Sequence, residues 1–536
     1  MNSVSGSTNN SQSQLINLKT IGLWAIAGCV LLLLAFTVMK IRDGLYFDDT
    51  FMFVRYAHNI IKYGNYGWNA HEHTYGCTNI PFTFFIVLLK LLRIDQLFGL
   101  SATLLLSSFF WAVLSLLFLY KIIGNLAGKF FGSSRWLILL FLCTVAIAPV
   151  FSYNIITGMD TTFSLFFNVL MIHFLFRYIS KPGIIYVLPA AWFSYFIFLL
   201  RPDCGIYSVL LPILLFLDAK LPVKKIVFFY ALLFVFFGAD TFIKYFYFGN
   251  PLPLPFFIKK SGFYLGYLGK STWNAVQYSF DFLIDFGFLF FAFLLFVTWR
   301  ALKKFMVFGI PVLLTLLYFF TVNQIMGFHS RYYLPSMPFW IIGIIYGFRE
   351  IKTLKISMDQ LVVPALYVTF LLFLQFASPI YELYVQKKSQ AEAAQFSMPP
   401  TVANRMACRI MDYKGGIQAM QNLISLLPAD ATIAATEYGY LSVKAPDNKF
   451  MDLCGLHNYE FALHGYSDHM LGAWNPTLIW LPANEYTALR KQIITGDYFK
   501  QHYDFYPDAM SYGIAVLKNS PYHDKLIQRM TELDCQ

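Results

Sequence analysis

Two adjacent carboxylates, Asp48 and Asp49, are the residues of this chain best suited to catalysis. They follow the first apolar segment long enough to cross a membrane, in the aromatic stretch D-G-L-Y-F-D-D-T-F-M-F-V-R-Y-A-H-N-I. A carboxylate here can act as a general base that takes a proton from an attacking hydroxyl, while its neighbour holds the base, the acceptor or a cation. Tyr46 and Arg55 flank the pair as candidate substrate contacts. The alternative is an interfacial ion pair with Arg42 or Arg55.

Three further polar motifs could contact a substrate. Tyr75 and Asn79 lie in Y-G-C-T-N-I-P, which could equally be a turn that ends a loop. Asp160 ends N-I-I-T-G-M-D and could instead be the N-cap of the helix that follows. Arg201, in R-P-D-C-G, could bind a phosphate or pair with Asp203.

Two basic motifs complete the candidate phosphate contacts. N-P-L-P-L-P-F-F-I-K-K carries Lys259 and Lys260, and its three alternating prolines predict an extended segment rather than a helix. The two lysines either bind an anion such as phosphate or extend to outer lipid head groups. H-S-R-Y-Y-L-P places His329 and Arg331 at the start of an apolar segment, as phosphate ligands or as interfacial anchors.

Composition assigns these motifs to an integral membrane protein. Hydrophobic residues make up 58% of the 536 residues and charged residues 13%, against about 25% charge in an ordinary soluble chain. The net charge of +11 is expected from cytoplasmic loops. Because the sequence shows no soluble basic face, it predicts membrane lipids and no nucleic acid among the partners.

The apolar pattern predicts a polytopic α-helical protein with about eleven transmembrane helices. Residues 1–18 form a polar, disordered tail, and residues 19–378 form the membrane domain with a first outer loop at 40–97. The basic clusters between spans fall on one side, which predicts a cytoplasmic N-terminus and an external C-terminus. The expected spans are 21–39, 98–120, 136–152, 160–178, 184–200, 203–218, 226–247, 279–299, 305–322, 332–348 and 360–378.

One apolar stretch and the last part of the chain differ from this pattern. Pro81–Leu92 is too short to cross a membrane and predicts an interfacial or re-entrant helix. Residues 379–536 predict a soluble α/β domain outside the membrane. One pair among its three cysteines could form a disulfide there. The cysteines are Cys408, Cys454 and Cys535. Its expected strands are 431–436, 449–453, 477–481 and 514–517, with helices near 402–426, 484–494 and 521–533.

The motifs combine carboxylates that could act as a general base, dispersed cations that could bind phosphate, and aromatic side chains that could line an apolar cleft. Together they suggest one reaction. A lipid-linked phosphosugar would lie in the membrane with its sugar in an outer aqueous cleft. An acceptor hydroxyl would attack the anomeric carbon, and the lipid phosphate would leave, stabilised by arginine and lysine.

The ordered motifs resemble those of GT-C-type membrane glycosyltransferases, in particular the bacterial group that includes the mycobacterial arabinofuranosyltransferases. D-D-T-F-M-F-V-R-Y-A-H-N-I, Y-G-N-Y-G-W-N and Y-G-C-T-N-I-P-F-T resemble their first outer loop. T-G-M-D-T-T-F, R-P-D-C-G, P-L-P-L-P-F-F-I-K-K and S-R-Y-Y-L-P-S-M-P are similar to their later motifs. A-T-E-Y-G-Y and D-L-C-G-L-H resemble their soluble domain. The resemblance covers nearly the whole chain.

The resemblance implies a GT-C fold and an inverting transferase with a polyprenyl-phosphate-linked sugar donor. The base would be Asp48 or Asp49, and Arg201, Lys259, Lys260 and Arg331 would contact the phosphate. The acceptor would be a cell-envelope glycan, a lipid-linked glycan or a protein, on the periplasmic or extracellular side of a bacterial inner membrane. Some GT-C enzymes use a divalent cation (Mg, Mn or Ca), and this sequence offers acids but no decisive ligand set.

Two other functions compete with this one. A transporter or flippase of lipid-linked sugars predicts repeated halves and ionisable residues in mid-span, whereas the polar motifs here cluster on one predicted face and no internal repeat is seen. A non-catalytic assembly scaffold would use the outer α/β domain to bind a partner.

Overall fold

The computed structural model is mostly helical and describes nearly three-quarters of the chain. The described residues are 28, 47–131, 135–260, 274–294, 298–321, 330–350, 413–482, 486–507, 509–510 and 512–534. The expected spans 21–39 (apart from residue 28) and 360–378, the N-terminal tail, Tyr46, His329, Cys408 and Cys535 lie outside them.

Contacts divide the chain into two compact units. The first, here the helical unit, comprises residues 1–45, 98–236 and 274–387. The second, here the mixed unit, comprises residues 46–97, 237–273 and 388–536. The first-loop motifs thus belong to the same unit as the C-terminal domain. The boundaries expected from the linear sequence stay predictions.

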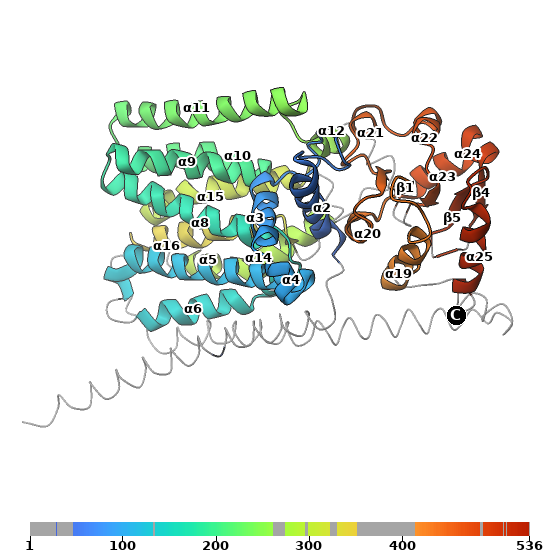
Figure 1. Cartoon of the computed structure of the whole chain (residues 1–536). Coiled ribbons are helices and arrows are strands. Elements are labelled where there is room, and N and C mark those ends of the chain that lie inside the picture. The colour runs from blue at the N-terminus through green and yellow to red at the C-terminus, as the bar shows by residue number, and fades with distance from the viewer. Residues whose placement is uncertain are drawn as a thin grey trace, which may run out of the picture. The chain divides into compact units, whose positions relative to one another are not determined.

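The helical unit is built from long apolar helices that pack side by side. In Figure 1, α8 lies between α9 and α5, and α15 packs against α16. Its elements are α5 (Leu100–Phe131), α6 (Arg135–Ile147), α7 (Pro149–Ile155), α8 (Thr161–Ser180), α9 (Ile184–Leu200), η1 (Pro202–Cys204), α10 (Gly205–Asp218), the first half of α11 (Val223–Phe248), α14 (Asn274–Leu294), α15 (Trp299–Phe319), η3 (Leu334–Ser336) and α16 (Met337–Phe348).

Among the described residues, four helices are long and apolar enough to cross a membrane. They are Leu100–Leu126, Thr161–Ser180, Val223–Phe248 and Trp299–Phe319. Shorter apolar helices occupy Ile80–Leu91, Ile184–Leu200 and Leu334–Phe348. A helical membrane protein agrees with this pattern, while the expected total of eleven spans stays a prediction.

Two of the expected span boundaries are wrong. The expected span 136–152 is divided between α6 and α7, because Pro149 takes the first position of α7 and cannot continue α6. The cluster Arg300, Lys303 and Lys304, expected in a loop, lies in the first turns of α15. Lysine and arginine are good helix formers, and Lys304 binds Asp218 of α10 at 2.8 Å.

The mixed unit contains a five-stranded sheet among its described residues. The strand order is β2-β1-β3-β5-β4, with β1 parallel to β2 and β3, and β5 antiparallel to β3 and β4. The strands are β1 (Thr432–Ala435), β2 (Lys449–Asp452), β3 (Leu478–Trp480), β4 (Tyr503–Tyr506) and β5 (Ile514–Leu517). The helices around it are α19 (Tyr413–Ile424), α20 (Gly439–Lys444), α21 (Tyr459–His464), α22 (Asp468–Trp474), α23 (Thr487–Thr495), α24 (Asp497–His502) and α25 (His523–Asp534).

The strands predicted from the sequence are confirmed for β1, β2, β3 and β5. Strand β4 was not expected. Its sequence Y-D-F-Y carries an acid and buries only its first residue, so it lacks the continuous apolar run that marked the others.

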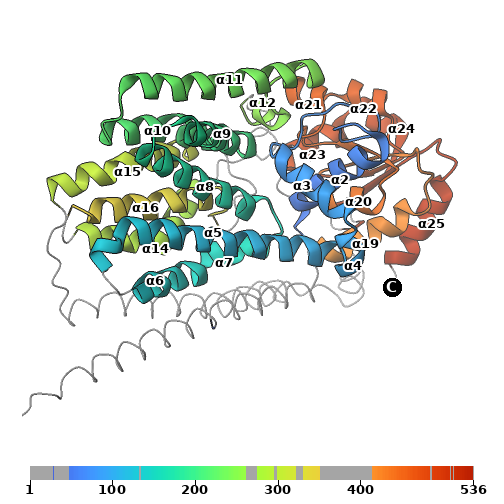
Figure 2. The same cartoon turned by 60° about the vertical axis from the view of Figure 1, so that its left-hand side comes forward.

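The first-loop segment adds helices to the mixed unit. They are α2 (Asp48–Tyr63), α3 (Ile80–Leu91), α4 (Ile94–Phe98, whose last residue is assigned to the helical unit) and α12 (Leu254–Lys260). Helix α2 packs against both α3 and α20 (Figure 2). The prediction that the whole proline-rich segment is extended is wrong, since α12 begins at Leu254. Pro255 is tolerated in its first turn, where a missing N–H costs nothing.

Candidate active site

Asp48 caps a helix of the C-terminal domain. Its Oδ2 accepts a hydrogen bond from the Gly439 amide at 2.8 Å, and its Oδ1 accepts one from the Tyr440 amide at 2.9 Å. These amides begin α20 and would otherwise lack partners, because the first turn of a helix has unpaired N–H groups. Both carboxylate oxygens are therefore engaged in structure, and the side chain is buried.

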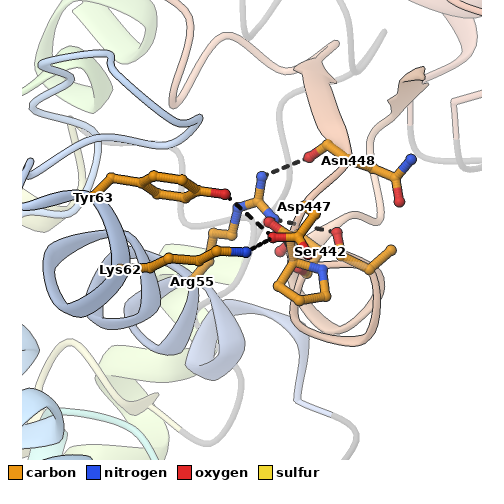
Figure 3. A network of polar contacts seen from close by, with 8 residues as sticks. Arg55, Lys62, Tyr63, Ser442, Asp447 and Asn448 are labelled. Carbon is orange, nitrogen blue, oxygen red and sulfur yellow. Dashed lines mark hydrogen bonds and ion pairs between the residues drawn. The ribbon is translucent and has the colours of Figure 1, made fainter. Parts of the chain in front are cut away.

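Arg55 binds the other end of α20. Its Nη atoms donate to the backbone carbonyls of Ser442 (3.0 Å), Pro446 (2.6 Å) and Asn448 (2.7 Å), as Figure 3 shows in part, and its Nε donates to Trp68 O at 2.9 Å. Burial lowers the pKa of the guanidinium to about 10. Because this value is still well above 7, the group stays charged at neutral pH. Arg55 is thus a structural anchor in this geometry, not an exposed substrate contact.

Asp49 differs from its neighbour. It follows Asp48 on α2, so it points about 100° further round the helix axis. Its side chain is half-buried, whereas Asp48 is buried. Asp49 is therefore the less buried of the two acids.

A buried imidazole, that of His457, joins the first-loop segment to the segment that follows β2. The Gly76 amide donates to Tyr56 Oη (3.2 Å), and Tyr56 Oη lies 3.0 Å from His457 Nδ1. Nε2 of the same ring lies 3.2 Å from Met52 Sδ, so both ring nitrogens have a partner. The ring of His457 stacks on Trp68 with centroids 4.3 Å apart.

Burial moves the pKa values of two neighbouring groups in opposite directions. It lowers the pKa of His457 to about 3, so the imidazole is neutral. It raises the pKa of Asp452 to about 6, although the carboxylate accepts hydrogen bonds from the amides of Cys454, Gly455 and His457. Cys454 is a free, buried thiol, so it does not supply the disulfide considered from the sequence.

The other first-loop candidates also have structural partners. Asn79 accepts a hydrogen bond from the Phe82 amide at 2.9 Å and caps α3, which agrees with the turn interpretation. Tyr75 is buried, and its ring stacks on Phe248 with centroids 5.0 Å apart. Its carbonyl accepts from the Leu254 amide at 2.8 Å.

Sequence reasoning missed an ion pair in the mixed unit. Lys244 Nζ lies 2.7 Å from Asp240 Oδ2 and 5.0 Å from the centre of the Tyr75 ring. Both residues are in α11, which was treated only as an apolar span. Opposite charges four residues apart within such a helix were the available signal.

The helical unit brings together two of the predicted phosphate ligands. Arg201 lies 5.3 Å and Arg331 5.0 Å from the centre of one ring, that of Tyr332. Arg201 also pairs with Asp203 at 3.0 Å, and Arg331 donates to Tyr332 Oη at 3.1 Å. Both arginines are buried. Asp203 supplies a carboxylate partner to Arg201 within the cluster, and the two guanidinium groups share one aromatic ring.

Asp160 belongs to the helical unit. It stands at the N-cap position of α8, but in the described structure its side chain makes no capping hydrogen bond. Arg201 is close enough to Asp160 for the two charges to interact. The N-cap interpretation therefore does not account for this carboxylate.

The remaining candidates stay predictions. The backbone of Lys259 and Lys260 lies in α12 of the mixed unit, while their side chains, like Tyr46 and His329, are outside the described part of the chain. Within that described part, no three His, Cys, Asp or Glu side chains gather as a metal site would require.

No protein-family model matches the chain, and no curated protein is similar to it at a significant level.

Proposed function

We propose that this protein is an inverting membrane glycosyltransferase of GT-C type with about eleven spans, which uses a polyprenyl-phosphate-linked sugar as donor. The acceptor is a hydroxyl of a cell-envelope glycan, a lipid-linked glycan or a protein. The membrane is a bacterial inner membrane, with the C-terminal domain on its outer side.

The buried pair of arginines over Tyr332 is the observation that carries this proposal. Arginine binds phosphate through two parallel hydrogen bonds, and stacking on a ring fixes the plane of the guanidinium. Arg201 follows the last residue of α9, and Arg331 precedes η3 and α16, so both stand at the ends of apolar helices. A lipid-linked phosphate has a matching chemistry, because its charged group can bind arginine while its lipid chain packs against apolar helices.

The acids of α2 support the second half of the reaction. Transfer needs a base for the acceptor hydroxyl, and the leaving phosphate needs positive charge as the bond to the anomeric carbon breaks. The Asp48–Asp49 pair is the source of this base in the proposed reaction.

The arginine pair is tested by neutralising each guanidinium in the purified full-length chain. Arg201→Gln and Arg331→Gln should each raise the KM for a polyprenyl-phosphate sugar by about 10- to 100-fold, because a hydrogen bond to a charged group is lost. Binding of the donor to each variant can be measured separately by titration.

Arg349→Gln is the matched control. Arg349 also lies over a tyrosine ring, 5.6 Å from the centre of Tyr346, in the same unit but at the other end of α16. It should leave the KM unchanged. Unchanged donor affinity in both Arg201→Gln and Arg331→Gln would overturn the assignment of the phosphate to this cluster.

A further inference from the structure

Asp240 and Lys244 place two charges on a buried face of an otherwise apolar helix. Lys244 is 5% exposed, while Ile243 and Tyr245, on either side of it in the sequence, are 64% and 58% exposed. The side chain of Asp240 is 12% exposed. Ionisable groups within an apolar helix are costly, and where they occur they commonly mark the path of a substrate. The pair stands near the end of α11, since Lys244 is four residues, about 6 Å, before the last residue Phe248.

The first-loop turn brings a tyrosine against this pair. Lys244 Nζ lies 5.0 Å from the centre of the Tyr75 ring, and Tyr75 is close enough to Asp240 for the two groups to interact electrostatically. Tyr75 is 4% exposed, and its ring stacks on Phe248 with centroids 5.0 Å apart. Lys244 and Phe248 are four residues apart, so one face of α11 holds the ring through both side chains.

These three polar side chains have more hydrogen-bonding capacity than the described residues use. Lys244 can donate three hydrogen bonds, and it donates one within the described part of the chain, to Asp240 Oδ2 at 2.7 Å. The other carboxylate oxygen, Asp240 Oδ1, and the hydroxyl of Tyr75 have no hydrogen-bond partner among the described residues. Because buried polar groups are normally paired, the capacity that is left over indicates a polar ligand.

From this geometry, and resting on the proposed function, we propose that Asp240, Lys244 and Tyr75 form a subsite for the hydroxyl groups of a sugar. A hydroxyl both donates and accepts hydrogen bonds. The ammonium of Lys244 donates to one sugar hydroxyl, and the carboxylate of Asp240 accepts from the next. Because the two opposite charges offset each other, the subsite suits a neutral polar group better than an anion. The sugar belongs to the lipid-linked donor or to the acceptor glycan, since both carry the same hydroxyl chemistry.

Binding measurements on the purified full-length chain test the subsite with three probes. They are a panel of polyprenyl-phosphate sugars, the same polyprenyl phosphate without a sugar, and an oligosaccharide fragment of a bacterial cell-envelope glycan. Lys244→Met and Asp240→Asn should each weaken the binding of a sugar-bearing probe at least 10-fold, because a hydrogen bond to a charged group is lost. Binding of the bare polyprenyl phosphate should not change. Weaker binding of the polyprenyl-phosphate sugar assigns the subsite to the donor, and weaker binding of the oligosaccharide assigns it to the acceptor.

An exchanged pair separates a ligand contact from a merely structural ion pair. The double variant Asp240→Lys, Lys244→Asp keeps opposite charges four residues apart but moves the ammonium by one helical turn, about 6 Å. Its thermal unfolding midpoint should stay near that of wild type, while its binding of the sugar-bearing probe stays weak. Arg529→Met, which removes another ion pair within one helix of the mixed unit, is the control and should bind every probe as wild type does.

Wild-type affinity for every sugar-bearing probe in both single variants would refute the subsite, and so would restored affinity in the exchanged variant. If wild type binds a polyprenyl-phosphate sugar more tightly than bare polyprenyl phosphate but transfers no sugar, the proposed function fails while the subsite stands. The two failures are therefore distinguishable.

Discussion

At the scale of single residues, the two adjacent acids have different surroundings. The carboxylate of Asp48 is a helix cap, while Asp49 is half-buried on the next position of α2. Sequence reasoning could find the pair but could not separate its members, because the amides that bind Asp48 come from a segment almost 400 residues away. Arg55 was assigned to a substrate for the same reason, since its carbonyl partners are equally remote.

His457 and Asp452 should oppose each other in the pH dependence of stability. His457 has a pKa lowered from 6.5 to about 3 in the fold, so its contribution is complete above pH 6.5 and is lost as the pH falls towards 3. Asp452 has a pKa raised from 3.8 to about 6, so its contribution is complete below pH 3.8 and is lost as the pH rises through 6. Between about pH 4 and 6 the two slopes nearly cancel.

Removal of either group should reveal the effect of the other on the pH dependence of stability. Relative to wild type, His457→Gln should lose stability as the pH rises from 4 to 6, by up to about 1.4 kcal/mol per pH unit. Asp452→Asn should show the reverse and lose stability as the pH falls across that range. Thermal unfolding of the purified chain at half-unit pH steps measures both variants. Parallel profiles for wild type and both variants would show that neither group changes its pKa on folding.

At the scale of elements, two short loops meet where only glycine fits. A Cβ at Gly76 would lie 2.1 Å from His457 Nδ1 and 2.5 Å from Tyr56 Oη, both of which are buried. The first-loop turn Y-G-C-T-N-I-P and the segment D-L-C-G-L-H are thus packed through one residue. The sequence contained both motifs, but their pairing depends on tertiary contacts that no local pattern encodes.

Gly76→Ala should therefore separate these two loops. Overpacking of a buried contact costs about 1–3 kcal/mol, so the unfolding midpoint should fall, and the buried thiol of Cys77 next to it should become reactive towards maleimide. Gly238→Ala is the matched control, because a Cβ there meets nothing within 4 Å and alanine favours a helix. A Gly76→Ala protein as stable as wild type, with Cys77 still protected, would contradict the close packing.

The elements themselves were predicted unevenly. Apolar periodicity located the long helices and four of the five strands, since burial imposes those patterns directly. Short elements held by capping were missed, such as α20, whose ends are satisfied by Asp48 and Arg55. The ion pair of Asp240 and Lys244 was also missed, because it interrupts an otherwise apolar helix.

At the scale of the whole molecule, each compact unit is assembled from stretches that are far apart in the sequence. The first-loop segment 46–97 groups with residues 388–536, although 290 residues of the chain lie between them. The contacts of Asp48, Arg55 and Gly76 explain this grouping residue by residue. Deleting the C-terminal domain would therefore also leave buried charges of α2 without partners, so such a deletion cannot by itself distinguish a scaffold from an enzyme.

Product analysis with purified wild-type protein tests the central claim most directly. The protein, reconstituted in vesicles, is given a small panel of labelled polyprenyl-phosphate sugars with an acceptor glycan, with and without a chelator. Free polyprenyl phosphate and a glycoside of inverted anomeric configuration should appear together, and Asp49→Ala should form neither. Movement of intact labelled lipid across the vesicle membrane, with no glycosidic bond made from any donor, would contradict it.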